Sequence, residues 1–137
     1  MPIIETPPRP KSNKRGSPEG KIQSQCVAWF WNEYPEYRGL LFHIPNEGNR
    51  ESKTDGAYRK ALGLVAGVSD LMLLVARGSY HGLCIEMKTE IGRQSDVQKE
   101  WQLKAEKQGY KYILVRSLDA FQVEIRKYFA KSLEIPK

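Results

Sequence analysis

Two acidic side chains and a lysine have types and a spacing that could bind a divalent cation beside an amine. Asp70 is followed after fifteen residues by Glu86, and Lys88 comes two positions later. Side chains alternate along a strand, so Glu86 and Lys88 project from one face while Ile85 and Met87 project from the other. If the two segments pair antiparallel, the start of the first strand lies beside the end of the second. We therefore expect Asp70 to lie beside Glu86.

Carboxylates that converge repel each other and require either a proton or a cation between them. Oxygen ligands without a supporting His or Cys favour Mg²⁺, for which Mn²⁺ can substitute, over zinc. A neighbouring lysine can orient or deprotonate a water molecule while the metal neutralises charge on a phosphate. The alternative interpretation of Glu86 and Lys88 is a surface strand that ends in a solvated ion pair.

The loop and helix after this strand carry further polar side chains. Arg93 and Gln94 are hydrogen-bond donors placed where a phosphate could approach, although an ordinary polar loop would have the same composition. Ser95 and Gln98 have the spacing of a capping box, which alone accounts for Gln98 at this position. Trp101 is expected in the core.

A mixed sheet with helices on its faces is needed to position these residues. Hydrophobic periodicity, capping residues and turn signals define each element. The expected helices cover 18–34, 55–64, 95–109 and the segment after Ser117, and the expected strands cover 40–44, 70–76, 83–88 and 110–115. The strands 70–76 and 83–88 should form an antiparallel hairpin. The order α-β-(α)-β-β-α-β-α predicts an α/β fold with a mixed β-sheet flanked by helices.

Composition limits the class of protein. The 137 residues suit one domain, which we place at 18–137, and a 40% hydrophobic share excludes full disorder. The 22 Lys and Arg against 16 Asp and Glu give a net charge of +6, which favours a polyanionic partner. No apolar run is long enough for a membrane span, so we expect a cytoplasmic protein without a membrane partner.

Residues 1–17 form a separate zone, which we interpret as a flexible basic arm. The zone holds four prolines and four basic residues against Glu5 alone. Such a segment buries too little apolar surface to order itself, and it is either a solvated tail or a contact for nucleic acid. The cysteines Cys26 and Cys84 lack the spacing of a zinc site, and we expect His43 and His81 to be structural or solvent-facing.

The combination of motifs resembles the PD-(D/E)xK nuclease superfamily, and within it the virus-type replication-repair nuclease (VRR-NUC) domain. The resemblance covers residues 18–129. It includes a glutamate before an Ile-Gln pair, here Glu19 and Ile22-Gln23. Residues 43–48 resemble the family's segment after the first strand. Its motifs follow one another in the family's order: Gly67-x-x-Asp70, Glu86-x-Lys88, Gly92-Arg93-x-Ser95 and Gln98-x-x-Trp101.

The resemblance implies a restriction-endonuclease-like fold and roles for individual residues. Asp70, Glu86, the backbone carbonyl of Met87 and Glu19 would bind Mg²⁺, and Lys88 would be the catalytic lysine. Gln98 would support the active site, and Asn46 joins Arg93 and Gln94 as a candidate DNA contact. Ser69 stands where the family usually has a proline, which provides no ligand.

The expected function is Mg²⁺- or Mn²⁺-dependent endonucleolytic hydrolysis of DNA. Small members of this family resemble junction-cleaving enzymes of bacteria and phages, so the expected substrate is branched DNA such as a Holliday junction. Paired incisions in a two-fold symmetric junction would require a homodimer. The alternatives are a flap-specific or sequence-specific nuclease, and a catalytically idle nucleic-acid-binding module.

Overall fold

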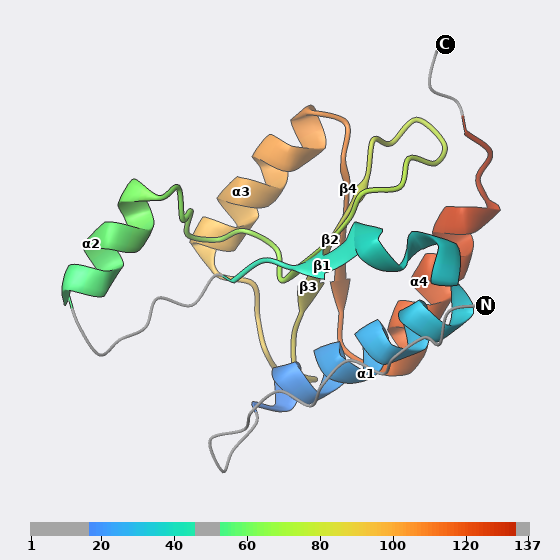
Figure 1. Ribbon diagram of the computed structural model, residues 1–137, viewed down its shortest axis with the longest axis horizontal. Helices are drawn as coiled ribbons and strands as arrows, with labels where there is room; N and C mark the ends of the chain where they lie inside the picture. Colours follow the sequence, from blue (N-terminus) through green and yellow to red (C-terminus); the bar gives the residue numbers. More distant parts are fainter. Residues whose placement is uncertain (1–16, 46–52, 134–137) are drawn as a thin grey trace.

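The computed structural model describes residues 17–45 and 53–133, which form a four-stranded sheet with helices on both faces (Figure 1). The elements in chain order are α1 (Pro18–Glu33), the 3₁₀-helix η1 (Pro35–Leu40), β1 (Leu41–His43), α2 (Lys53–Ala61), β2 (Leu71–Leu73), β3 (Leu83–Met87), α3 (Asp96–Lys107), β4 (Lys111–Val115) and α4 (Leu118–Ala130). The predicted α/β class and element order are confirmed. The expected arm lies almost wholly outside the described residues.

The sheet is mixed, with the strand order β1-β2-β3-β4. The strands β1, β2 and β3 pair antiparallel in succession, whereas β3 and β4 pair parallel. A parallel pair needs a crossover connection, and α3 provides it between β3 and β4. The site-bearing strand β3 is therefore central, with β2 on one side and β4 on the other.

The helices divide between the two faces of the sheet. Helices α1 and α4 contact each other, and α1 also contacts β3 while α4 contacts β4 (Figure 1). Their buried side chains, which include Phe30, Phe121 and Ile125, form one core with the sheet residues Leu71 and Ile85. Helix α3 contacts β4 on the opposite face. None of the described helices is long and apolar enough to cross a membrane.

Helix termini follow the local sequence signals. The Ser17 side chain accepts the backbone N–H of Gly20 at 3.0 Å and begins α1 immediately before Pro18. Ser95 and Gln98 form both hydrogen bonds of the expected capping box at the start of α3. These caps satisfy backbone donors that have no partner within the helix.

The strands are shorter than predicted. The apolar run 70–76 forms a strand only over Leu71–Leu73, because the chain leaves the sheet after Leu74 donates its backbone N–H to the Leu40 carbonyl. The connection to β3 then makes its own turn, in which Arg77 and Tyr80 form an isolated bridge. The strand expected over 40–44 covers only Leu41–His43, and η1 precedes it. Apolar character therefore predicted neither where pairing ends nor, at Phe42 and Leu74, which side chains are buried.

Candidate active site

The antiparallel register brings Asp70 beside Glu86, as the sequence predicted. Leu71 pairs with Ile85, so the position before Leu71 lies opposite the position after Ile85. Asp70 Oδ2 accepts the backbone N–H of Met87 at 2.6 Å. This bond ties the carboxylate of one strand to the backbone between Glu86 and Lys88, which fixes where Asp70 points.

Glu86 is completely buried and its two carboxylate oxygens have different surroundings. Oε1 accepts hydrogen bonds from the Tyr112 hydroxyl and from Gln94 Nε2, the latter at 3.3 Å. Oε2 is buried and has no hydrogen-bond partner among the described residues. Lys88 Nζ lies 3.7 Å from Oε2, and its side chain is 13% exposed. The alternation of side chains along β3 thus places Glu86 and Lys88 together, and the solvated surface pair is excluded because Glu86 has no solvent contact.

Burial and neighbouring charge make ionisation of Asp70 unfavourable. Burial raises the pKa of Asp70 above its usual value, and the negative charges of Glu86 and Glu19 raise it further. The Met87 N–H and the nearby His43 act in the opposite direction but do not cancel this effect. Glu19, in the first turn of α1, therefore lies close enough to influence the acidic pair. Three acidic groups that repel one another form the electrostatic condition that a cation relieves.

The donor set and one orphaned atom fit a hard divalent cation. A buried carboxylate oxygen without a partner is costly, and Glu86 Oε2 is such an atom. Asp70 and Glu86 offer oxygen ligands, which suit Mg²⁺ or Mn²⁺. Within 17–45 and 53–133, no group of three His, Cys, Asp or Glu side chains is close enough to hold a metal together. Two carboxylates are thus the protein side chains that fit the ion best, as Mg²⁺ commonly retains several waters.

The remaining predicted residues lie in several different places. Gln98 Oε1 accepts the backbone N–H of Ser95 at 2.8 Å, so its amide serves the capping box. Arg93 is exposed on the loop before α3. Gln94 donates to Glu86 and also, at 2.8 Å, to Gln102 Oε1, which places its amide against the acidic pair. Asn46 lies outside the described residues.

Other side chains that were considered have structural surroundings. His43 is exposed, and its Nδ1 lies 2.9 Å from the Asp70 carbonyl oxygen. Ser69, which replaces the proline usual in the family, is buried and donates its hydroxyl to the Leu71 carbonyl at 3.1 Å. This backbone carbonyl is the hydrogen-bond partner of the hydroxyl, so Ser69 has a structural role and is not assigned as a metal ligand.

Tyr112 and Gln102 are functional candidates that sequence reasoning missed. Tyr112 pairs with Cys84 across the parallel β3–β4 ladder, and Cys84 lies on the Glu86 face by alternation. Alternation of side chains along β4 could have placed Tyr112 on that face. The contact of Tyr112 with Glu86, however, depends on the register between β3 and β4, which no local motif encodes. Gln102 is one turn after Gln98 on α3, and the same helical spacing would have shown it facing the sheet.

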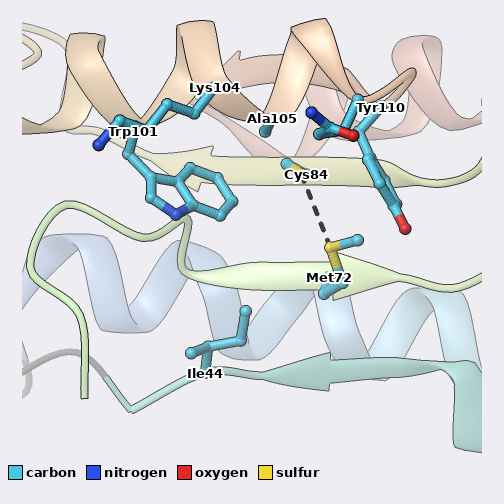
Figure 2. A pocket seen from close by; sticks show the side chains of 8 residues that line it. Ile44, Met72, Cys84, Trp101, Lys104, Ala105 and Tyr110 are labelled. Carbon is cyan, nitrogen blue, oxygen red and sulfur yellow. Dashed lines mark hydrogen bonds between the residues drawn. The ribbon is translucent and has the colours of Figure 1, made fainter. Parts of the chain in front are cut away.

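An apolar pocket of about 330 Å³ lies on the same face of the sheet, between α3 and the strands (Figure 2). Trp101 and Tyr110 stand on either side of a sulfur contact, in which Cys84 Sγ lies 3.6 Å from Met72 Sδ. Its lining consists of Ile44, Met72, Cys84, Trp101, Lys104, Ala105, Gln108 and Tyr110. None of these residues belongs to the acidic pair, so the pocket is separate from the candidate active site.

Comparisons with known proteins identify the family to which this fold belongs. The VRR-NUC domain matches residues 17–119. A solved structure described as a "VRR_NUC domain protein" superposes with a TM-score of 0.73 at 26% identity, and the match covers 87% of this chain and 93% of that chain. No curated protein matches the chain. The chain therefore belongs to the VRR-NUC family and contains a nuclease domain of the PD-(D/E)xK type.

Proposed function

We propose that this protein is a Mg²⁺-dependent, structure-specific DNA endonuclease, with Mn²⁺ able to replace Mg²⁺. The observation that supports this proposal most strongly is the buried Glu86 Oε2. Within 17–45 and 53–133 this oxygen has no hydrogen-bond partner, although Asp70 and Lys88 lie beside Glu86. A purely structural carboxylate would have its buried oxygens satisfied. A catalytic cation site requires a carboxylate oxygen that is free to bind the ion, and Glu86 Oε2, near Asp70 and the Lys88 amine, meets this requirement.

Asp70 and Glu86 would hold the metal, with the Met87 carbonyl as a further oxygen ligand. A ligand role for Glu19 stays a prediction of the sequence, because no three acidic side chains of the described residues lie close enough to share one ion. Since Asp70 Oδ2 accepts the Met87 N–H, its other oxygen, Oδ1, would face the ion. The ion would supply positive charge to the phosphate as negative charge develops on it during hydrolysis.

Lys88 would orient the attacking water and stabilise the negative charge that develops on this water as it loses its proton to bulk solvent. Its position 3.7 Å from Glu86 Oε2 places the amine beside the metal ligands, and a side chain only 13% exposed is held there by packing. A cleaved phosphodiester gains negative charge, which an adjacent ammonium group stabilises. A supporting role for Gln98 stays a prediction of the sequence, because its side-chain oxygen accepts the Ser95 N–H in the capping box.

The proposed substrate is branched DNA, and Holliday junctions are the expected form. A net charge of +6 favours binding to the phosphate backbone, which carries no sequence information by itself. Arg93 is exposed in the loop between β3 and α3 and would contact a phosphate. Contacts of Gln94 and Asn46 with DNA stay predictions of the sequence. We further propose that the enzyme acts as a homodimer, since a four-way junction has near two-fold symmetry and needs two incisions.

A cleavage assay on matched DNAs tests this function. Four-way junction, flap, nicked duplex and linear duplex should be compared at equal concentration with Mg²⁺, Mn²⁺ or EDTA. We expect junction cleavage that requires the metal. The Lys88→Ala substitution should lower the cleavage rate by about 10²–10⁴-fold while junction binding is retained. Lys107→Ala at the far end of α3 is the matched control.

Each other outcome contradicts a defined part of the proposal. Preference for flap or for one linear sequence would replace the junction with that substrate. Binding without cleavage in either metal would identify an idle nucleic-acid-binding module. Junction cleavage that persists in Lys88→Ala would remove the assigned role of the lysine. A monomer in light scattering with full junction cleavage would remove the homodimer.

A further inference from the structure

Glu86 is held from one side by hydrogen-bond donors that belong to β4 and to the loop before α3. The Tyr112 hydroxyl and Gln94 Nε2 both donate to Oε1. Gln94 is itself oriented by Gln102, because the same Nε2 lies 2.8 Å from Gln102 Oε1. The hydrogen bonds that the carboxylate accepts from the described residues therefore converge on one oxygen, and the other oxygen faces Lys88.

We propose that Tyr112 is a positioning residue for metal capture, which fixes Glu86 so that Oε2 alone faces the ion. Gln94 and Gln102 complete the same network. This inference rests on the proposed function, since it assigns a role toward the metal of that site. A residue of this kind acts through Glu86 and does not touch the metal or the DNA.

The physical reason is the soft terminal torsion of a glutamate. Rotation about that bond is broad and nearly two-fold, so an unrestrained carboxylate exchanges its oxygens easily. Two donors on Oε1 remove this freedom before the ion arrives. Partners that orient a metal ligand in this way commonly change metal affinity by about 10–100-fold when they are removed.

Tyr112 is itself fixed by its surroundings. It is buried on β4 in register with Cys84, and the Trp101 ring of α3 lies 6.1 Å from the Tyr112 ring, centroid to centroid. From this fixed position the hydroxyl donates to Glu86 Oε1.

The test compares Tyr112→Phe with the wild-type full chain by direct titration with Mn²⁺, followed by the loss of the free Mn²⁺ signal in electron paramagnetic resonance. This measurement does not depend on cleavage. Tyr110→Phe is the matched control, because Tyr110 lies two residues earlier and its side chain lines the apolar pocket. Gln94→Met, which keeps the length of the side chain but removes its donor, is a second variant. The melting temperature of each metal-free protein is measured alongside.

We expect Tyr112→Phe and Gln94→Met to weaken Mn²⁺ binding by about 10–100-fold and Tyr110→Phe to leave it unchanged. Wild-type affinity in both Tyr112→Phe and Gln94→Met would overturn the inference, and a lowered melting temperature with that unchanged affinity would assign Tyr112 to the fold alone. Failure of the proposed function looks different, because the wild-type protein itself would then bind no Mn²⁺. If Tyr112→Phe does not fold, Gln94→Met decides between these results.

Discussion

Asp70 and Met87 are joined across two strands by a 2.6 Å hydrogen bond from the Met87 backbone N–H to Asp70 Oδ2. The bond holds the acid that immediately precedes β2 against the backbone that links Glu86 to Lys88. It does so at the end of a short antiparallel pair, where only Leu71–Leu73 of the first strand are paired. One side-chain bond therefore fixes the position of Asp70 relative to the two other residues proposed to be catalytic.

Removal of the Asp70 charge should stabilise the metal-free protein. Burial and neighbouring acids raise the pKa of Asp70 above the 3.8 of a free side chain, so the folded protein holds this proton more tightly than the unfolded chain does. The free energy of unfolding therefore falls as pH rises from 3.8 through the folded pKa, and the penalty is complete above it. We expect Asp70→Asn in EDTA to melt a few degrees higher than wild type at pH 7, and by a smaller margin near pH 3.5.

The control for this measurement is Asp119→Asn, which removes a carboxylate from the first turn of α4. That charge complements the helix dipole, so its loss should lower the melting temperature slightly. An Asp70→Asn protein that melts below wild type at pH 7 would show that the Asp70 carboxylate is not in a repulsive environment.

Gly67 should be required to hold α3 against the start of β2. Its φ is +86°, and an added Cβ would lie 2.6 Å from the Val97 carbonyl oxygen. Strain and overlap act together, so Gly67→Ala should lower the free energy of unfolding by about 2–4 kcal/mol in urea titrations. At Gly39 an added Cβ meets nothing within 4 Å, so Gly39→Ala should change stability by no more than about 0.5 kcal/mol. Equal effects of the two substitutions would contradict the close packing at Gly67.

Both cysteines should be unreactive in the folded protein. Burial raises the pKa of Cys84 to about 11 and the pKa of Cys26 to about 12, so very little thiolate forms near pH 8. We expect slow labelling by Ellman's reagent at pH 8 in the native state and fast labelling of two thiols in guanidinium chloride. Fast labelling of the native protein at pH 8 would show that at least one cysteine is open to solvent. The labelling rate would then rise with pH around a midpoint near the pKa of an ordinary thiol.

The N-terminal segment should contribute to DNA affinity through charge. Residues 1–16 carry four basic residues and Glu5, which gives +3. If these side chains neutralise phosphates, deletion of 1–16 should weaken junction binding and make it less dependent on salt, by up to about four units in the slope of log K against log salt. Affinity measured between 50 and 200 mM salt checks this. Equal affinity and equal slope would leave the segment without a role in binding.

The sequence predicted the position of Asp70 beside Glu86 better than it predicted the surroundings of these two residues. The pairing of Asp70 with Glu86 follows from side-chain alternation and from a hairpin, which are both local properties. Tyr112 reaches Glu86 from β4, whose parallel register with β3 is set by the crossover through α3 and by tertiary packing. No motif encodes such a contact, so the donor that fixes Glu86 became visible only in the fold.

Other differences have equally local causes. Residues 71–76 are all apolar and several of them are buried, yet the sheet pairing ends near Leu74. Hydrophobicity does not distinguish those two states. Gln98 had two readings in the sequence, and the structure places its amide in the capping box, where a short-range hydrogen bond to Ser95 is available.

The most direct measurement is an anomalous difference map from a crystal of the protein soaked in Mn²⁺. We expect one strong peak between Asp70 Oδ1 and Glu86 Oε2, about 2.0–2.4 Å from each oxygen, and no such peak in Asp70→Asn. Metal density elsewhere, or an empty space between the two carboxylates at saturating Mn²⁺, would contradict the proposal that these acids share a catalytic ion.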